Sequence, residues 1–511
     1  MSQLAHARVR FAGDGLSVVR FPFAFPTPSL LLRPGRGPPA LHHPLTESRA
    51  RRFTGRSRAK GKYMNTRRQL GLPALTQGMG GFTTIWIGQF VSLLGSAMTR
   101  FAISVWAWQT TGQATSLALI GFFSFAPTVL LAPLAGVLID RHSRKLVLIL
   151  SDAAAAVSTL ALLILHSRGA LEIWHLYAAG IFASAFEAFQ LPAFIASISM
   201  MVDRRQYARA NAMQSSNRFA SSLAAPVLAG ALLVTIGLRG ILLIDLLTFS
   251  VAMGTLAIVR IPRPERSDAG KRTRLWDQVR EGLTYVRTHR SLIGVIALLF
   301  LLNLPGSAAM ITFSAMILAR TGNDKVILGI VQSIMGAGGV VGGVVVAAWG
   351  VRVHRRMQAV LWLRGIRRVA AFLILAVART PVLWSIGAFF ATFFAVAATS
   401  VNTSMLQAKV PNKLQGRFFS VYRVVGQATI PLGFLMAGPL VDRVLEPAMA
   451  ADTGLARALG PVVGTGPGAG MAVLFLATAV LGVLTCLGAT LVRPIREIDR
   501  LLPDRPTDEG E

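Results

Sequence analysis

The chain has few charged residues for its size, and acidic residues are especially scarce. Charged residues make up 14% of its 511 positions, whereas a typical soluble domain has about 25%. The single cysteine, Cys486, excludes a disulfide or a cysteine-based metal site within one chain. The sequence has neither an HExxH pair nor a Walker-type phosphate loop, which argues against a zinc peptidase and against direct use of ATP. We therefore expect no catalytic residues, no metal and no cofactor, and we do not expect an enzyme.

Long apolar blocks are what the chain has in abundance. Hydrophobic residues make up 53% of it, gathered in blocks of about twenty, the length of helix that crosses roughly 30 Å of hydrocarbon. Twelve blocks are predicted, at residues 82–108, 114–138, 146–166, 173–199, 213–235, 240–260, 291–318, 326–350, 358–378, 383–405, 418–442 and 471–493. The expected fold is an all-α polytopic membrane protein with twelve transmembrane helices in the lipid bilayer. The glycines from Gly336 to Gly343 should let helices pack closely, and tryptophans near block ends, such as Trp108 and Trp384, are expected at the membrane interface.

Residues 1–78 contain no block of this length but carry much of the net charge of +30. They hold 14 Lys and Arg against two Asp and Glu, with Pro-rich pieces and an Arg-rich run from Arg49 to Lys62. Such a composition buries too little apolar surface to offset the entropy of ordering, so we expect a disordered basic extension. Whether residues 1–63 exist in the mature protein stays open, because Met64 is an alternative start. Since most other positive charge lies in short loops, we expect no nucleic-acid partner.

The charge of the loops predicts the orientation of the chain. With the amino terminus in the cytoplasm, the inner loops carry 21 Lys and Arg and the outer loops carry 7, which makes both termini cytoplasmic. The long loop at 260–290, in which residues 276–288 form an expected surface helix, separates six blocks from six. We predict a six-helix bundle over 79–260, a cytoplasmic linker over 261–290, a second bundle over 291–493 and a tail over 494–511.

The two bundles are expected to be pseudo-symmetric, because the second repeats features of the first. Arg218 and Pro226 of the fifth block recur as Arg423 and Pro431 of the eleventh, both 205 positions later. Internal repeats of this kind are typical of secondary transporters, whose substrate site lies between the repeats near the membrane midplane. We therefore expect a transporter of a small molecule, working as a monomer.

The loop between the second and third blocks reads Gly136-Val-Leu-Ile-Asp140-Arg141-His-Ser-Arg144-Lys145. It resembles the signature loop G-x-x-x-D-R-x-x-R-K of the major facilitator superfamily and occupies the same place. The resemblance implies a gate, in which Asp140 pairs with basic groups or a helix amino end of the other bundle. The corresponding loop of the second bundle, Val351 to Arg356, has the arginines but lacks the acid.

Shorter motifs are similar to those of the macrolide-efflux and enterobactin-exporter branch of that superfamily. They are Leu93-Leu94-Gly95-Ser96 and Phe101-Ala102, the run from Glu187 to Ala193, Asn211-Ala212, and Asp245 with Phe249. The resemblance covers residues 80–495 and implies proton-coupled export of an amphipathic molecule of drug, macrolide or siderophore type across a bacterial plasma membrane. The fifth block departs from the pattern, since alanines stand around Pro226 where the branch has glycines.

Glu187 is the first candidate for a proton or substrate site. Charges at membrane depth are costly and are functional candidates by default. Glu187 lies about fourteen residues into the fourth block, near the predicted midplane, where we expect it to be buried. A carboxylate that binds a proton in one conformation and releases it in the other meets the need of an antiporter; the alternative is a structural hydrogen bond between helices.

Five further charged residues within the blocks are candidates: Asp152, Asp245, Arg100, Arg218 and Arg423. Because an unpaired buried charge costs several kcal/mol, we expect either aspartate to pair with Arg100 or Arg218. Arg218 and Arg423 lie about one turn into their blocks, from where they can also reach the membrane surface.

The ninth block carries Arg364, Arg367 and Arg368 on one helical face. Two interpretations stay open: the arginines line a water-filled cavity that attracts anions, or this block lies partly in the membrane interface, which we favour. At the level of function, an importer or a non-transporting sensor or scaffold with the same fold also stays open.

Overall fold

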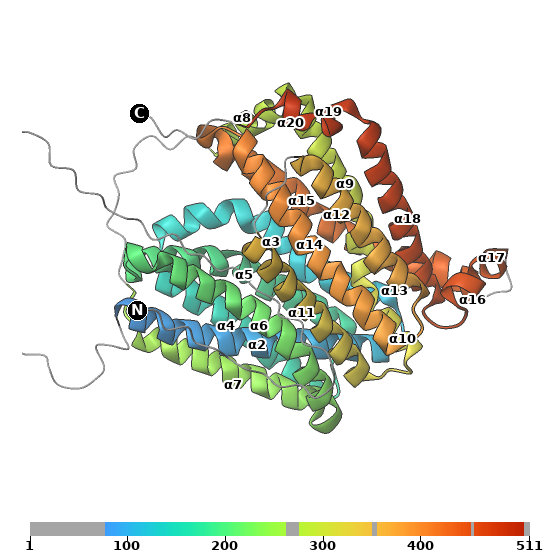
Figure 1. Cartoon of the computed structure of the whole chain (residues 1–511). Helices are drawn as coiled ribbons and strands as arrows, with labels where there is room; N and C mark the ends of the chain where they lie inside the picture. Colours follow the sequence, from blue (N-terminus) through green and yellow to red (C-terminus); the bar gives the residue numbers. More distant parts are fainter. Residues whose placement is uncertain (1–76, 262–274, 350–354, 451–453, 505–511) are drawn as a thin grey trace, which may run out of the picture. The chain divides into compact units, whose positions relative to one another are not determined.

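The computed structural model describes residues 77–261, 275–349, 355–450 and 454–504, and in these ranges the ordered structure is helical without a strand (Figure 1). The expected extension at 1–76 lies outside the described residues, as does most of the linker. The expected surface helix of the linker is confirmed as α8, Leu275–Thr288.

Six long helices form the first group. They are α2 (Gly78–Thr111), α3 (Ala114–Arg141), α4 (Arg144–Ser167), α5 (Ile173–Met201), α6 (Tyr207–Thr235) and α7 (Gly237–Ile258). Their ends follow local chemistry: α2 stops at Gly112, whose φ of 62° suits glycine. The helices pack on one another through the pairs α3–α5, α2–α7, α4–α5 and α2–α6.

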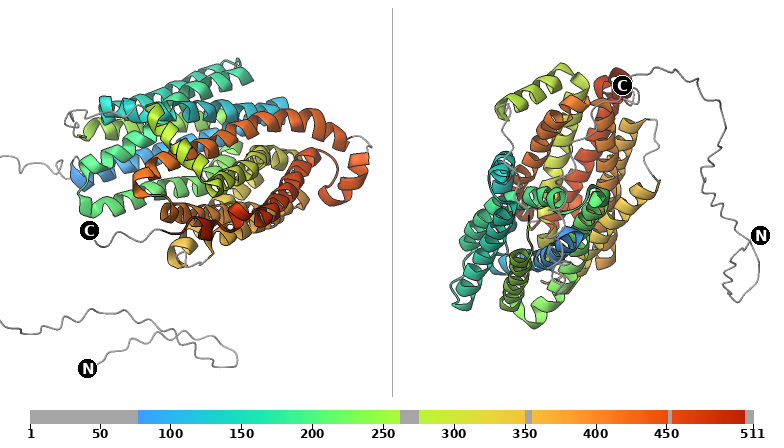
Figure 2. Two further views of the ribbon diagram at one scale, coloured as in Figure 1. Left: turned by 90° about the horizontal axis from the view of Figure 1, so that it is seen from above. Right: turned by 90° about the vertical axis from the view of Figure 1, so that its left-hand side faces the viewer.

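The second group consists of the helices after α8. They are α9 (Arg290–Ile311), α10 (Phe313–Arg320), α11 (Lys325–Trp349), α12 (Arg356–Arg367), α13 (Ile374–Val377), α14 (Pro381–Lys409), α15 (Asn412–Leu440), α16 (Glu446–Ala450), α17 (Gly454–Val463), α18 (Ala469–Leu491), α19 (Arg493–Arg496) and α20 (Ile498–Leu501). Two π-helical segments, η2 (Arg368–Leu373) and η3 (Val441–Leu445), continue α12 and α15. Figure 2 shows the first group in blue to green and the second in yellow to red.

The ninth predicted block differs from the other eleven. Within the described residues, eleven helical segments are long and apolar enough to cross a membrane, and the ninth block is absent from them. It is helical from Arg356 to Val377, but the π-helical segment η2 separates α12 from α13. The arginines of this block also lower its mean hydropathy. The described residues thus show eleven of the twelve expected spans, and the crossing by the ninth block stays a prediction.

Close approaches at glycines join the two groups. The pairs α6–α11 and α3–α15 connect them. A Cβ added at Gly329 of α11 would lie 2.5 Å from the carbonyl oxygen of Pro226 in α6, and one at Gly336 would lie 2.5 Å from that of Ser222. The expectation of close packing is therefore confirmed at Gly336, whereas Gly343 of the same run meets nothing within 4 Å and Gly329 lies before the run.

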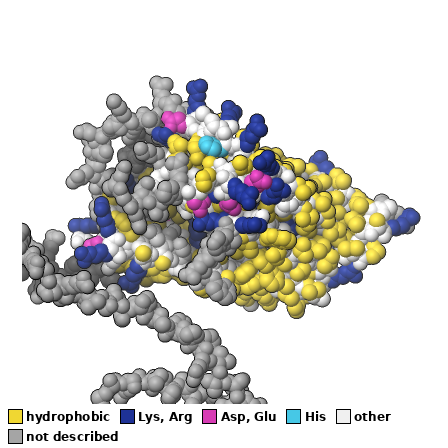
Figure 3. All heavy atoms as spheres, turned by 45° about the horizontal axis from the view of Figure 1, so that its top comes forward, with side chains coloured by type: hydrophobic (Ala, Val, Ile, Leu, Met, Phe, Trp, Pro, Cys, Tyr) yellow, Lys and Arg dark blue, Asp and Glu magenta, His cyan; other side chains and the backbone are white. Residues whose placement is uncertain are grey.

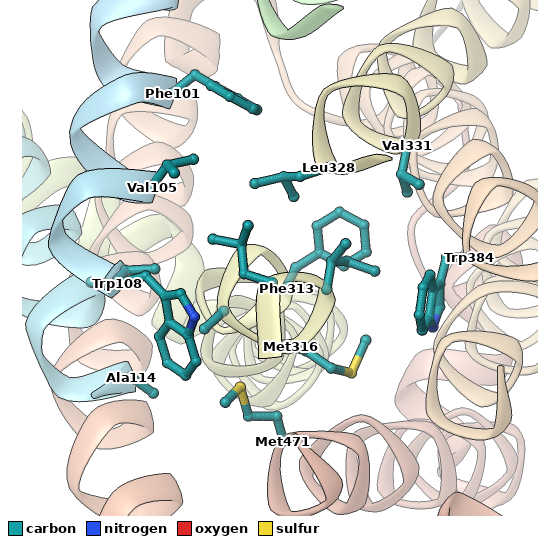
Figure 4. Packing of buried hydrophobic residues seen from close by; sticks show 14 of the residues in the cluster. Phe101, Val105, Trp108, Ala114, Phe313, Met316, Leu328, Val331, Trp384 and Met471 are labelled. Carbon is teal, nitrogen blue, oxygen red and sulfur yellow. The ribbon is translucent and has the colours of Figure 1, made fainter. Parts of the chain in front are cut away.

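A hydrophobic cluster from both groups surrounds α10 (Figure 4). Phe313 and Met316 of α10 lie among Val105 of α2, Leu328 of α11 and Met471 of α18. In contrast to the expected interfacial position, Trp108 is 9% exposed and Trp384 is 2% exposed, and both belong to this cluster. These tryptophans lie near helix ends but on inward-facing sides of their helices, which hydropathy alone does not reveal.

The outer surface of the described residues is apolar. Leu130 of α3, Leu247 of α7 and Leu491 of α18 are more than half exposed, and Figure 3 shows a broad hydrophobic surface, with Lys and Arg gathered mainly in the upper and central part of the view. Such a surface suits hydrocarbon rather than water, and helices satisfy their backbone groups internally, as a bilayer demands. The chain is a multi-pass membrane protein.

We expect Gly329→Ala to destabilise the contact between α6 and α11 by about 1–3 kcal/mol, the usual cost of overpacking. The new Cβ would meet a backbone carbonyl, which cannot move aside as a flexible side chain can. The matched control is Gly343→Ala on the same helix, where a Cβ meets nothing within 4 Å. Thermal unfolding of the purified protein in detergent measures the effect, and an equal loss in both variants would contradict the assignment.

Candidate functional site

The predicted gating loop joins α3 to α4. It lies on the side of the protein where α2 begins and α18 ends, which we call the terminal side. We call the opposite side the distal side. The side chains of Asp140 and Arg141, and the surroundings of Gly136, lie outside the described residues, so the gate itself stays a prediction. Lys145 donates to the carbonyl oxygens of Ala257, at 3.0 Å, and Val259, at 2.9 Å. Its charge thus caps the carboxyl end of α7.

The second half of the loop is therefore fastened within its own group of helices. Arg144, next to Lys145, is half-buried as the first residue of α4. Both residues lie at the start of the same helix, so the cap on α7 fixes where α4 enters the membrane.

Asp152 is at the centre of a polar network inside the first group. It is 1% exposed. Its two carboxylate oxygens accept hydrogen bonds from Gln89 of α2, at 2.8 Å, and Gln190 of α5, at 2.7 Å. The side-chain Nε2 of Gln190 also donates a hydrogen bond to Oε1 of Gln89, at 3.3 Å. The network ties α2, α4 and α5 together at a site that can take up or release one proton.

Asp245 forms a separate network between α2, α4 and α7. It is 1% exposed and accepts hydrogen bonds from Ser96, at 3.2 Å, and Thr159, at 3.1 Å. Gly95 makes room for it, since a Cβ there would lie 3.0 Å from the Asp245 carboxylate. Arg100 attracts Asp245 electrostatically without forming an ion pair.

The expected pairing of the buried aspartates with arginine is wrong. Among the ion pairs of the described residues, none joins Asp152 or Asp245 to Arg100 or Arg218. Both arginines are exposed. Neutral amide and hydroxyl donors satisfy the aspartates instead, so a long cationic side chain is not needed beside them.

Glu187 is exposed, which corrects its expected burial. It lies on a protein-facing side of α5, because Gly180, two turns earlier, packs against Ser124 of α3. The large exposed apolar residues Ile181 and Phe182 lie on the other side of the helix. Glu187 is three residues before Gln190, so it stands one turn from the Asp152 network.

The second group contains a cavity of about 580 Å³. Residues of five helical elements line it: Leu299, Leu302 and Asn303 of α9; Arg364 and Arg367 of α12 and Arg368 of η2; Ala395, Ala398, Thr399, Thr403 and Gln407 of α14; and Phe419, Tyr422, Arg423, Gly426 and Gln427 of α15. Of the two interpretations of the ninth block, the structure therefore supports the cavity. Arg423 lines the same space, although its side chain is largely exposed.

Backbone carbonyl groups and one aromatic ring hold two of the cavity arginines, Arg367 and Arg368, in place. Arg367 donates through Nε to the carbonyl oxygen of Ala391 at 2.9 Å. Arg368 donates through Nη2 to the carbonyl oxygen of Leu302. Their guanidinium carbons lie 5.3 and 4.6 Å from the ring centre of Phe372, a cation–π distance.

Neutral polar residues are the part of the site that our sequence analysis missed. Gln89 and Gln190 bind Asp152, while Asn402 donates to the Tyr422 hydroxyl at 2.7 Å beside the cavity. The signal was present, because uncharged polar side chains inside apolar blocks also carry a cost in hydrocarbon.

Asp442 at the start of η3 joins the two groups on the distal side. Its carboxylate oxygens accept hydrogen bonds from the backbone N–H groups of Ala114, at 3.0 Å, and Thr115, at 2.7 Å. These N–H groups form the amino end of α3, which favours negative charge. Nearby, a Cβ at Gly438 would lie 2.5 Å from the Cα of Thr115. A carboxylate of the second group thus caps a helix of the first.

Comparison with known proteins gives concordant results. The family model described as Major Facilitator Superfamily matches residues 85–434. The chain is 26% identical to macrolide efflux protein A of Streptococcus pyogenes, over 71% of this chain and 90% of that protein. It is 24% identical to the multidrug efflux pump Tap of Mycobacterium bovis, over 83% of this chain and 97% of that protein.

Solved structures show the same fold. A bacterial homologue of the human lysosomal transporter Spinster, inward-facing and unoccupied, aligns with a TM-score of 0.61 at 17% identity, covering 84% of this chain and 99% of that one. A bacterial homologue of the iron transporter ferroportin, inward-facing, aligns with a TM-score of 0.57 at 16% identity, covering 80% and 98%.

Loss of the Asp442 carboxylate should loosen the distal contact between the groups. In Asp442→Ala, two N–H groups of α3 lose their acceptor, at a cost of about 0.5–2 kcal/mol. A cysteine placed at buried Leu117, in a background with Cys486→Ala, should then react faster with a maleimide. The control is Asp324→Ala, since Asp324 caps α11 from within its own group. Equal labelling rates in the two variants would refute a joining role for Asp442.

Proposed function

Because the chain belongs to the major facilitator superfamily of transporters, we propose that it exports an amphipathic small molecule from the cytoplasm by alternating access, driven by the proton gradient. The observation that carries this proposal is the match to efflux proteins along nearly their whole length, 90% of one and 97% of another. A proton-driven exporter needs no cofactor, and we propose none. We place the protein in a bacterial plasma membrane, as a monomer with both termini in the cytoplasm.

The packing supports an alternating-access mechanism. The contacts between the groups described above involve the later half of α6 with the earlier half of α11, and the start of α3 with the end of α15. All of these segments lie toward the distal side. With cytoplasmic termini, the protein is then closed on the outside, and breaking the Asp442 cap and the glycine contacts is the step that would open it outward.

We assign the coupling proton to Asp152, with Glu187 as its exchange partner. Asp152 is enclosed by two glutamine amides on two neighbouring helices. Protonation would remove its negative charge and weaken both of these hydrogen bonds. Because α2 and α5 are held through this one carboxylate, a proton can alter how they pack. Glu187 is exposed one turn away and is positioned to pass protons to and from water.

Transport into inside-out membrane vesicles tests the proposal. With an acidic lumen, vesicles should accumulate a labelled amphipathic probe such as a catecholate siderophore, and a protonophore should abolish this accumulation. We expect Asp152→Asn and Glu187→Gln each to lower accumulation at least tenfold, since neither variant can carry the proton. The control is Glu172→Gln, which changes an exposed residue at the start of the same helix as Glu187.

The outcome separates the parts of the proposal. Undiminished proton-driven accumulation in both variants, at equal expression, would remove these residues as proton carriers. Accumulation only when the gradient is reversed would make the protein an importer, and its absence for every probe under either gradient would favour a sensor or scaffold.

A further inference from the structure

The cavity of the second group has an excess of positive charge. Four arginines line it, namely Arg364, Arg367, Arg368 and Arg423, and no Asp or Glu stands among the described residues that line it. We propose that this cavity binds the oxyanion group of an amphipathic organic anion, and that such an anion is the exported molecule. This inference rests on the proposed export function and narrows its substrate class.

The chain makes room for these charges. A Cβ at Gly482 of α18 would lie 2.5 Å from the Cδ and Nε atoms of Arg368, and one at Gly306 of α9 would lie 3.3 Å from its Nη1 atom. Any larger residue at Gly482 would displace the guanidinium. The neighbouring helices therefore leave a space that the Arg368 side chain fills. This side chain does not extend back toward the membrane surface.

Two guanidinium nitrogen atoms of the cavity arginines keep unused hydrogen-bonding capacity. Arg368 is 2% exposed, yet its Nη1 atom has no hydrogen-bond partner within the described residues, and neither does the Nε atom of Arg364. An arginine carries five donors in a planar fork, which matches the two oxygens of a carboxylate. Buried donors without acceptors are rare in native structures, and a bound oxyanion would satisfy both of these.

Electrostatic repulsion between the cavity arginines also favours a bound anion. Arg364 and Arg368 each repel Arg367, and Arg364 also repels Arg368. Arg368 lies twelve residues into its helical segment from Arg356, a rise of about 18 Å, which places it well inside this segment, where it is buried. Like charges so close together in a buried position are costly without a counter-ion. An anion relieves the repulsion, whereas a cation would increase it.

The remaining lining fits the rest of an amphipathic molecule. Leu299, Leu302 and Phe419 offer apolar contacts, and Thr399 and Gln427 offer neutral hydrogen bonds. The volume of 580 Å³ falls in the range of about 300–1,000 Å³ that drug-sized ligands occupy. A phospholipid headgroup could supply the same oxyanion chemistry, so the experiment must distinguish a free organic anion from a lipid.

Equilibrium dialysis of the purified full chain tests the proposal with naphthalene-2-carboxylate and its neutral carboxamide, which have the same shape. In nanodiscs of phosphatidylcholine, we expect the carboxylate to bind at least tenfold more tightly than the amide. Arg364→Gln and Arg423→Gln should each remove most of this preference, and Arg364→Lys should keep part of it. Arg355→Gln is the control, because Arg355 is exposed just before α12 and does not line the cavity. Monodisperse elution in size exclusion confirms that each variant is folded.

Equal binding of carboxylate and amide, or an unchanged preference in both cavity variants, overturns the proposal. A second arm adds phosphatidylglycerol to the nanodiscs: if this lipid displaces the carboxylate and vesicles fail to transport it, the cavity belongs to a headgroup and the substrate assignment is wrong. Binding needs no pH gradient, so the two proposals fail separately. Arginine-dependent binding without proton-driven transport would overturn the export mechanism but leave the cavity as an anion site.

Discussion

Backbone-to-backbone contact at glycine is the constraint on which this molecule depends. In a bilayer, helices gain little from burying apolar side chains against each other, because lipid is equally apolar, so close van der Waals approach holds them together. Gly329 and Gly336 bring α11 onto carbonyl groups of α6, and Gly438 brings α15 onto α3. A surface without interlocking side chains can part and close again without repacking. The contacts that hold the groups together are therefore the same ones that the proposed alternating access would have to break.

The two groups have similar helices but opposite polar interiors. The first keeps two buried carboxylates, Asp152 and Asp245, each satisfied by neutral donors. The second keeps three arginines of the ninth helix around a cavity without an acid among its described lining. The repeat that relates Arg218 to Arg423 therefore survives in sequence but only partly in environment, since both are exposed but only Arg423 lines that cavity. The two proposals accordingly assign the proton to the first group and the substrate to the second.

Much of the fold was predictable, because hydropathy reports directly how much helix a bilayer can accept. The blocks, the linker helix and the close-packing glycines follow from local sequence. The predictions that were wrong concern which side of a helix a residue lies on. Trp108 and Trp384 were placed by their position along the helix, but the side on which they lie decides their burial. Glu187 was expected to be buried because of its position along the helix, but the side on which it lies leaves it exposed. The hydrogen-bond partners of Asp152 stand 63 and 38 positions away in the sequence, and a local sequence pattern does not reveal contacts over such separations.

The π-helical segment η2 has a consequence for the ninth helix as a whole. A π turn takes up one more residue than an α turn, so the residues after Leu373 are rotated by about 100° relative to an uninterrupted helix. Both α12 and α13 (Ile374–Val377) pack against α14 and α18. The extra residue therefore changes which side chains of α13 meet these two neighbours without changing the neighbours themselves.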